Sequence, residues 1–267
     1  MSLSFSLTKW YMDVVTGDGE AVVVQAAELH FAALHLHYAS VLHSRGPRVH
    51  ATASLRKAMP TQEGATMTWA SRALDTKATW HAESPTDSVT AGGIKETILE
   101  EGGGRVEWRC VMPLARAEVT LDGGRVVQGL GYVEELRLDL APWSLPVEEL
   151  RWGRFTGEGA SVVWLDWRGP HQKRIILKNG VRAEGTVTDG GVELTDDETR
   201  VQLEEGRVLR EGTLGGNALA AIAELGTALP AKILATTERI VCAPAVLEQP
   251  FMTPVKGWAI HASVKWP

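Results

Sequence analysis

The sequence has few cysteines, no long apolar run and no excess of basic residues. Its two cysteines, Cys110 and Cys242, cannot form a disulfide framework or a four-ligand zinc site. The formal net charge of −6 gives no basic footprint for nucleic acid. No apolar run approaches the roughly 20 residues that cross a bilayer, and the start soon reaches Lys9, unlike a secretory signal. We therefore expect a cytoplasmic protein with reduced thiols, no nucleic-acid partner and no integral membrane segment.

Signals for nucleotide binding and for nucleophilic hydrolysis are also missing. Residues 102–104 are three glycines, but a strand rather than a helix is predicted after them, which argues against a phosphate loop. There is no Gly-x-Ser-x-Gly elbow, and Cys110 has no base nearby in the sequence. These absences exclude the common nucleotide-dependent and acyl-transfer chemistries.

Four histidines in one segment, His30, His35, His37 and His43, raise the question of a metal site. In a strand, His35 and His37 share a face, which is usable ligand geometry. We identify no carboxylate or cysteine close by, and the polar face of a half-buried strand explains the histidines equally well. We therefore expect no metal site and no other cofactor.

Glycine is abundant, with 27 residues, and much of it lies in turn-forming clusters between alternating segments. These clusters are at residues 17–19, 92–93, 102–104, 122–124, 179–180 and 189–191. Asn-Gly, Asp-Gly and Gly-Gly pairs in such places are strong hairpin signals, and turns about every ten residues predict an all-β barrel or sandwich. One short helix near the C-terminus is predicted over Asn217–Leu225, with Asn217 as its N-cap and Gly226 after its end.

The most informative segment is Gly129–Leu138. At the period of a strand, Tyr132 and Glu134 share a face with three leucines, whereas Val133 and Glu135 fall on a face that resembles an ordinary solvated one. A carboxylate on an otherwise apolar row requires a partner or a function. We therefore single out Glu134.

A second candidate cluster lies in the hairpin predicted over residues 150–167. If the hairpin is regular, Trp152 faces Trp164, with Asp166 two residues further on and Arg154 on the row of Trp152. Two indoles, a guanidinium and a carboxylate could then project together towards a ligand. The competing interpretation is a buried Arg154–Asp166 pair, bracketed by the tryptophans, that holds the barrel floor.

Four motifs stand in a recognisable order: Lys9–Asp13, Gly129–Glu135, Arg151–Arg154 and Gly257–His261. In this order the chain resembles the carotenoid 1,2-hydratase (hydroxyneurosporene synthase) and AttH-like lipocalin superfamily. The resemblance implies two successive lipocalin-like (calycin) antiparallel β-barrels, which we place at residues 1–128 and 129–267. It also implies chemistry in an apolar pocket, such as water addition to isolated double bonds, or cyclisation or isomerisation of lipophilic metabolites.

The chain departs from this superfamily at one informative point. The central motif of the superfamily typically reads Gly-Tyr-x-Asp-His, and here Glu134 and Glu135 occupy its last two positions. Glu134 keeps the acid with one more methylene, whereas Glu135 replaces the imidazole. This replacement argues against carotenoid hydration itself.

Two functional hypotheses follow. The first is a cofactor-independent enzyme, a hydratase or an isomerase/cyclase, that uses general acid–base chemistry on a terpenoid- or polyene-like molecule. In this first hypothesis the catalytic candidates are Glu134, Tyr132 and Asp166. The substrate is bound by Trp152, Arg154 and Trp164, and these six residues form the predicted site. The alternative is a non-catalytic carrier of a hydrophobic ligand. A purely structural β module has less support, and the oligomeric state is left open.

Overall fold

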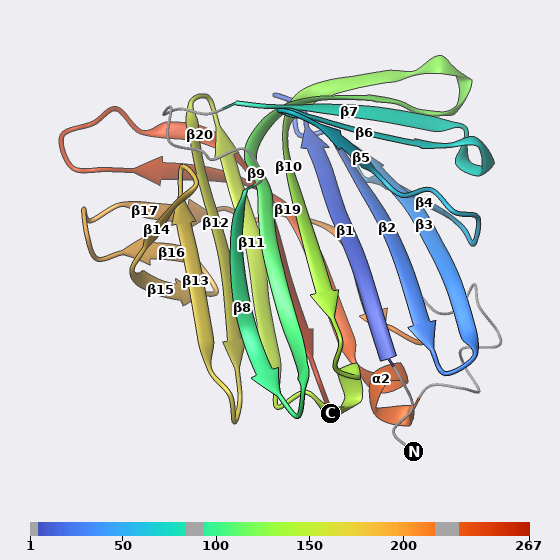
Figure 1. Ribbon diagram of the computed structural model, residues 1–267. Helices are drawn as coiled ribbons and strands as arrows, with labels where there is room; N and C mark the ends of the chain where they lie inside the picture. The colour runs from blue at the N-terminus through green and yellow to red at the C-terminus, as the bar shows by residue number, and fades with distance from the viewer. Residues whose placement is uncertain (1–4, 84–92, 217–229) are drawn as a thin grey trace. The chain divides into compact units, whose positions relative to one another are not determined.

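The computed structural model describes residues 5–83, 93–216 and 230–267, which form two compact units, residues 1–141 and 142–267. Each unit is built on a ten-stranded antiparallel sheet (Figure 1). The predicted all-β, lipocalin-like class is confirmed. The short α-helix α2 (Ala231–Ala235) lies near the C-terminus, whereas the helix predicted over residues 217–225 lies outside the described residues. No helix in the described part of the chain is long and apolar enough to cross a membrane.

Unit 1 is a sheet in the order β4-β3-β2-β1-β10-β9-β7-β6-β5, with β8 paired to β9 as well. Figure 1 shows the first and last of the strands, β1 and β10, side by side. The strands are β1 (Phe5–Val15), β2 (Ala21–Phe31), β3 (Leu34–Arg45), β4 (Arg48–Ser54), β5 (Thr61–Glu63), β6 (Thr66–Ser71), β7 (Thr76–Ala82), β8 (Ile94–Glu101), β9 (Gly104–Thr120) and β10 (Val126–Leu138). Two 3-10 turns, η1 (Arg72–Leu74) and η2 (Asp122–Gly124), connect strands.

Alternate residues of these strands form the core of unit 1 on one face of the sheet. Met12, Trp80 and Val133 are fully buried members of this core. The Trp80 indole donates a hydrogen bond of 2.7 Å to the backbone oxygen of Asp13. This approach requires Gly131, because a Cβ there would lie 3.0 Å from Trp80 and 2.3 Å from the Asp13 oxygen. The glycine after Leu130 is therefore a packing requirement.

Unit 2 repeats the plan in the order β14-β13-β12-β11-β20-β19-β17-β16-β15, with β18 paired to β19. Its elements are η3 (Pro142–Ser144), β11 (Glu149–Gly157), β12 (Ala160–Arg168), β13 (Lys173–Lys178), β14 (Val181–Ala183), β15 (Gly185–Thr188), β16 (Gly191–Leu194), β17 (Arg200–Leu203), β18 (Arg207–Thr213), β19 (Thr237–Glu248) and β20 (Val255–Lys265). Its core includes Phe155, Val162, Trp164 and Ala259.

The two units meet in sequence between Ala141 and Pro142. The boundary predicted after residue 128 falls instead inside β10, which pairs with β1 along its length and with β9 on its other side. A strand held between two neighbours belongs to their sheet, so the whole Gly129–Leu138 segment is part of unit 1.

Candidate functional site

The two faces of β10 are both buried, which corrects the prediction of one core face and one solvated face. Val133 has no exposed surface and belongs to the unit 1 core, and Glu135 is 3% exposed. Because Glu135 lies directly opposite Trp10 on β1, it faces the same side as that core. Glu134 points to the opposite face and is half-buried. The prediction that the face of Glu134 is the core face is therefore wrong, because the unit 1 core lies on the face of Val133 and Glu135.

Glu134 lies in a cluster on the face of unit 1 that points away from its core. Its Oε2 atom accepts a hydrogen bond of 2.9 Å from the Tyr132 hydroxyl and one of 2.5 Å from Trp108 Nε1. Tyr132 and Trp108 are almost completely buried, so both donors are fixed in place. Two donors to one oxygen favour the ionised carboxylate and fix its orientation. The structure thus brings together two of the six predicted site residues, Tyr132 and Glu134.

Cys110 completes the cluster, because it lies directly opposite Glu134 in the β9–β10 pair. Burial, and then the charge of Glu134, raise the pKa of the Cys110 thiol. Burial also raises the pKa of Tyr132 well above its usual value, with the neighbouring Cys110 and Glu134 adding to the effect. Tyr132 therefore remains a neutral hydrogen-bond donor, and Cys110 remains a thiol rather than a nucleophilic thiolate.

Trp108 is the member of the cluster that sequence reasoning missed. A tryptophan in an alternating strand is most simply interpreted as a core residue; Trp108 is indeed buried, but its indole N–H donates to Glu134. Trp108 pairs with Leu136, two residues beyond Glu134, only because β9 and β10 adopt a register interrupted by irregularities around Val133. No local sequence signal specifies that register.

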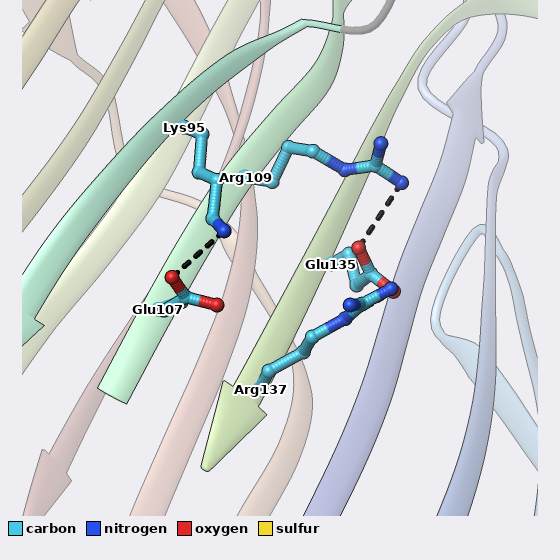
Figure 2. A pocket seen from close by; sticks show the side chains of 5 residues that line it. All are labelled: Lys95, Glu107, Arg109, Glu135 and Arg137. Carbon is cyan, nitrogen blue, oxygen red and sulfur yellow. Dashed lines mark hydrogen bonds and ion pairs between the residues drawn. The ribbon is translucent and has the colours of Figure 1, made fainter. Parts of the chain in front are cut away.

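Glu135 lies in a different, charged environment on the core side of the sheet. Its two oxygens pair with Arg109 Nη2 at 3.0 Å and with Arg137 Nη2 at 2.8 Å. Figure 2 shows these groups together with the Lys95–Glu107 pair, whose Nζ–Oε1 distance is 2.7 Å. The five residues line a pocket of about 90 Å³. Since a drug-sized ligand needs ~300 Å³ or more, this pocket is too small and too charged for a lipophilic molecule.

The other four predicted site residues lie in unit 2 and do not share one face. The β11–β12 register pairs Trp152 with Leu165 and pairs Trp164 with Gly153, so the predicted Trp152–Trp164 contact is wrong. The sequence predicts a loop over residues 156–160, but the hairpin closes through residues 158–159, with Gly157 opposite Ala160, and the register differs from the predicted one by one residue. Trp164 consequently packs in the unit 2 core over Gly153, where a Cβ would lie 2.3 Å from its ring.

Arg154 lies on the face opposite Trp164 and has no exposed surface. Its Nη1 donates to the Thr156 hydroxyl at 3.0 Å and to the Trp258 backbone oxygen at 2.9 Å. Alternation along the strand places Trp152 on the same face as Arg154. Trp152 and Arg154 therefore share one face of β11, as the alternation predicted.

Asp166 is 2% exposed and lies on the same face as Trp164. Arg168 Nε donates to one of its oxygens at 2.6 Å, and Arg174 Nε donates to the other at 2.9 Å. The predicted pairing with Arg154 is therefore wrong, because the register shift places the two side chains on opposite faces. Two guanidinium groups hold the Asp166 carboxylate, which is the usual way of compensating a buried charge.

The histidines of the segment after β1 include one group with the geometry of metal ligands. His30 and His35, together with Glu28, offer ligand atoms within 4.8 Å of one another. His35 Nε2 lies 2.8 Å from Glu28 Oε1. The expectation that no carboxylate lies close by is wrong, because the β2–β3 hairpin brings Glu28 to His37 as its direct cross-strand neighbour.

Comparison with known proteins gives a fold. No protein-family model matches the chain, and no curated protein matches it in sequence. Among solved structures it is similar to an AttH-type protein of Nitrosomonas europaea, with TM-score 0.54 and 9% identity, over 97% of this chain and 92% of that chain. It is also similar to kievitone hydratase of Nectria haematococca, with TM-score 0.53 and 10% identity, over 97% and 88% of the two chains. CghA with Sch210972 aligns with TM-score 0.51 and 11% identity, over 98% and 88%. The chain has the lipocalin-like fold of these proteins, as its motifs predicted.

Proposed function

We propose that the protein is a cofactor-independent enzyme that carries out general acid–base chemistry at Glu134 on a lipophilic small molecule, by hydration, cyclisation or isomerisation. The observation that carries the proposal is the Glu134 carboxylate, half-buried and held at one oxygen by Tyr132 and Trp108. A catalytic base needs a fixed orientation and a site of low polarity more than it needs exposure. The kievitone hydratase comparison supports a fold that can carry such chemistry.

In this proposal Glu134 takes a proton from the substrate and returns it. In an isomerisation the proton leaves one carbon and is added to another, so the reaction needs no further reactant. In a hydration Glu134 takes one proton from the water that adds to one carbon of the double bond and delivers one proton to the other carbon, so the carboxyl group ends unchanged. Tyr132 is a positioning residue, because its phenol holds the carboxylate while its raised pKa keeps the phenol protonated. Trp108 positions the same oxygen.

We propose a lipophilic substrate because an indole, two phenol rings and a neutral thiol lie around Glu134, on a face that also carries the buried Asp13 carboxylate opposite Tyr132. Trp152 and Arg154 share a face in unit 2, and their role in substrate binding stays a prediction from the sequence. Trp164 is assigned to the unit 2 core and Asp166 to its pairs with Arg168 and Arg174. Neither is given a catalytic role.

The proposal is tested by incubating the full chain with a panel of terpenoid and polyene alkenes in H₂¹⁸O and, separately, in D₂O. Products are analysed by mass spectrometry, where hydration adds a labelled oxygen and isomerisation or cyclisation adds deuterium. We expect label incorporation by the natural chain and none by E134Q. A matched control is E118Q, which changes an exposed carboxylate of the same sheet.

A different outcome would support the carrier. If a lipophilic molecule copurifies, binds equally to the natural chain and to E134Q, and is recovered without label, then the protein binds without turnover and the catalytic proposal fails.

A further inference from the structure

We propose that Glu28, His30, His35 and His37 form a binding site for one divalent transition-metal ion, with Zn²⁺ as the representative ion. The four residues lie on two paired strands, β2 and β3, close to the turn that joins them. The β2–β3 register places His30 directly opposite His35 and Glu28 directly opposite His37. All four side chains consequently project from one face, in two adjacent cross-strand pairs.

Ligand atoms of Glu28, His30 and His35 lie within 4.8 Å of one another, and His37 is the fourth residue beside Glu28. Glu28 Oε1 lies 2.8 Å from His35 Nε2, 3.7 Å from His30 Nε2 and 4.0 Å from His37 Nε2. In a tetrahedral zinc site with bonds of about 2.0–2.1 Å, neighbouring ligand atoms are about 3.4 Å apart. The observed distances lie on both sides of this value, so rotations of the side chains suffice to admit the ion.

The packing of the three imidazoles points to the same conclusion. The rings of His30 and His35 stack with centroids 4.0 Å apart, and His37 approaches His35 edge-on at 4.7 Å. Three imidazoles and one carboxylate gathered in this way are a set of ligands that suits zinc, copper or nickel.

The site is accessible from solvent and separate from Glu134. The side chains of His30 and His35 are about half exposed, at 51% and 49%, whereas Glu28 is 30% exposed. Glu28 lies opposite Thr8 on β1, on the side of Trp10, while Glu134 lies opposite Tyr11 on the other side. The metal site therefore does not depend on the proposed enzyme function. An ion bound there would join the ends of β2 and β3 beside their Ala32–Ala33 turn.

Equilibrium dialysis of the tag-free full chain against Zn²⁺, with the metal counted by mass spectrometry, tests the proposal. We expect one ion for each chain. Loss of one ligand in H35A should weaken binding by at least about 100-fold, because even the hydrogen-bond partners of metal ligands are worth 10–100-fold. The matched control H81A removes an exposed histidine of the same unit and should bind as the natural chain does. No bound ion, or equal binding by H35A and the natural chain, would overturn the proposal.

Two further measurements keep the result independent of folding. Circular dichroism checks that H35A is folded. If H35A is unfolded, the binding measurement is made with E28Q, which keeps the shape of the side chain. Co²⁺ bound in place of zinc should show the intense visible absorption of tetrahedral cobalt. The weak bands of a six-coordinate ion would instead mean that the four residues do not form the ligand set.

Discussion

Tyr132 and Glu134, two residues apart on one face of β10, are joined by a hydrogen bond of 2.9 Å from the phenol to the carboxylate. Trp108 donates to the same oxygen from the neighbouring strand. Two donors on one oxygen orient the Glu134 carboxylate from within its own sheet. This is the relationship on which the proposed chemistry depends.

We predict that Glu134→Gln lowers kcat by about 10²–10⁴-fold, the usual contribution of a general acid or base. The amide oxygen can still accept from Tyr132 and Trp108, so the midpoint of urea unfolding should change little. The measurement is turnover of whichever substrate the isotope-labelling screen identifies, beside an unfolding curve. Loss of the fold together with the activity would assign Glu134 a structural role.

Tyr132→Phe should keep the ring packing and remove one donor from Glu134. The ionised carboxylate is then less stabilised, so the acidic limb of the pH–rate profile should move to higher pH. Removing a buried hydrogen bond also costs about 1 kcal/mol of unfolding free energy. A profile with an unchanged acidic limb would mean that Tyr132 does not position the carboxylate.

Glu135→Gln should behave in the opposite way to E134Q. The buried Glu135 carboxylate compensates Arg109 and Arg137, and Arg109 also lies over the Trp10 ring, 5.5 Å from its centroid. Removing the charge leaves Arg109 without its acidic partner in this pair, so we expect the free energy of unfolding to fall by about 1–3 kcal/mol. Denaturant titration measures this loss. An E135Q protein with unchanged stability and no turnover would instead move the catalytic carboxylate to Glu135.

His261 on β20 should make stability depend on pH. Burial, and then the charge of Arg239, lower the pKa of its imidazole to about 4 in the folded chain. The unfolded chain, with a value near 6.5, binds the proton more readily between these limits. His261 therefore contributes stability that is fully present above about pH 6.5 and is lost as pH falls towards 4.

Between pH 7 and pH 5 we expect His261 to account for a fall of about 1–2 kcal/mol in the free energy of unfolding. Urea unfolding at the two pH values measures it, with H261Q as the comparison. The glutamine variant should show a smaller difference between the two pH values. An equal difference in both proteins would contradict the prediction.

The sequence by itself determined the class of fold and the most informative segment. Turn-forming glycines, such as those at 17–19, separate segments that alternate with the period of a strand, and this pattern follows from local backbone preferences. The short motifs around Gly129–Glu135 and Gly257–His261 pointed to the lipocalin-like fold that the structural comparison confirms. A carboxylate on an apolar row is likewise visible from alternation alone.

Only the tertiary structure decided which side chains meet. Packing in the folded chain buries residues on both faces of β10 and places the unit 1 core on the face of Val133. The pairing of β10 with β9 brings Trp108 to Glu134. A loop of two residues shifts the β11–β12 register by one and separates Trp152 from Trp164. Register depends on turn geometry and on contacts between distant strands, and a shift of one residue reverses every side chain. For the same reason, His35 and His37 join Glu28 and His30 only when the β2–β3 hairpin forms, whereas Glu28 and His30 already share a face by alternation along one strand.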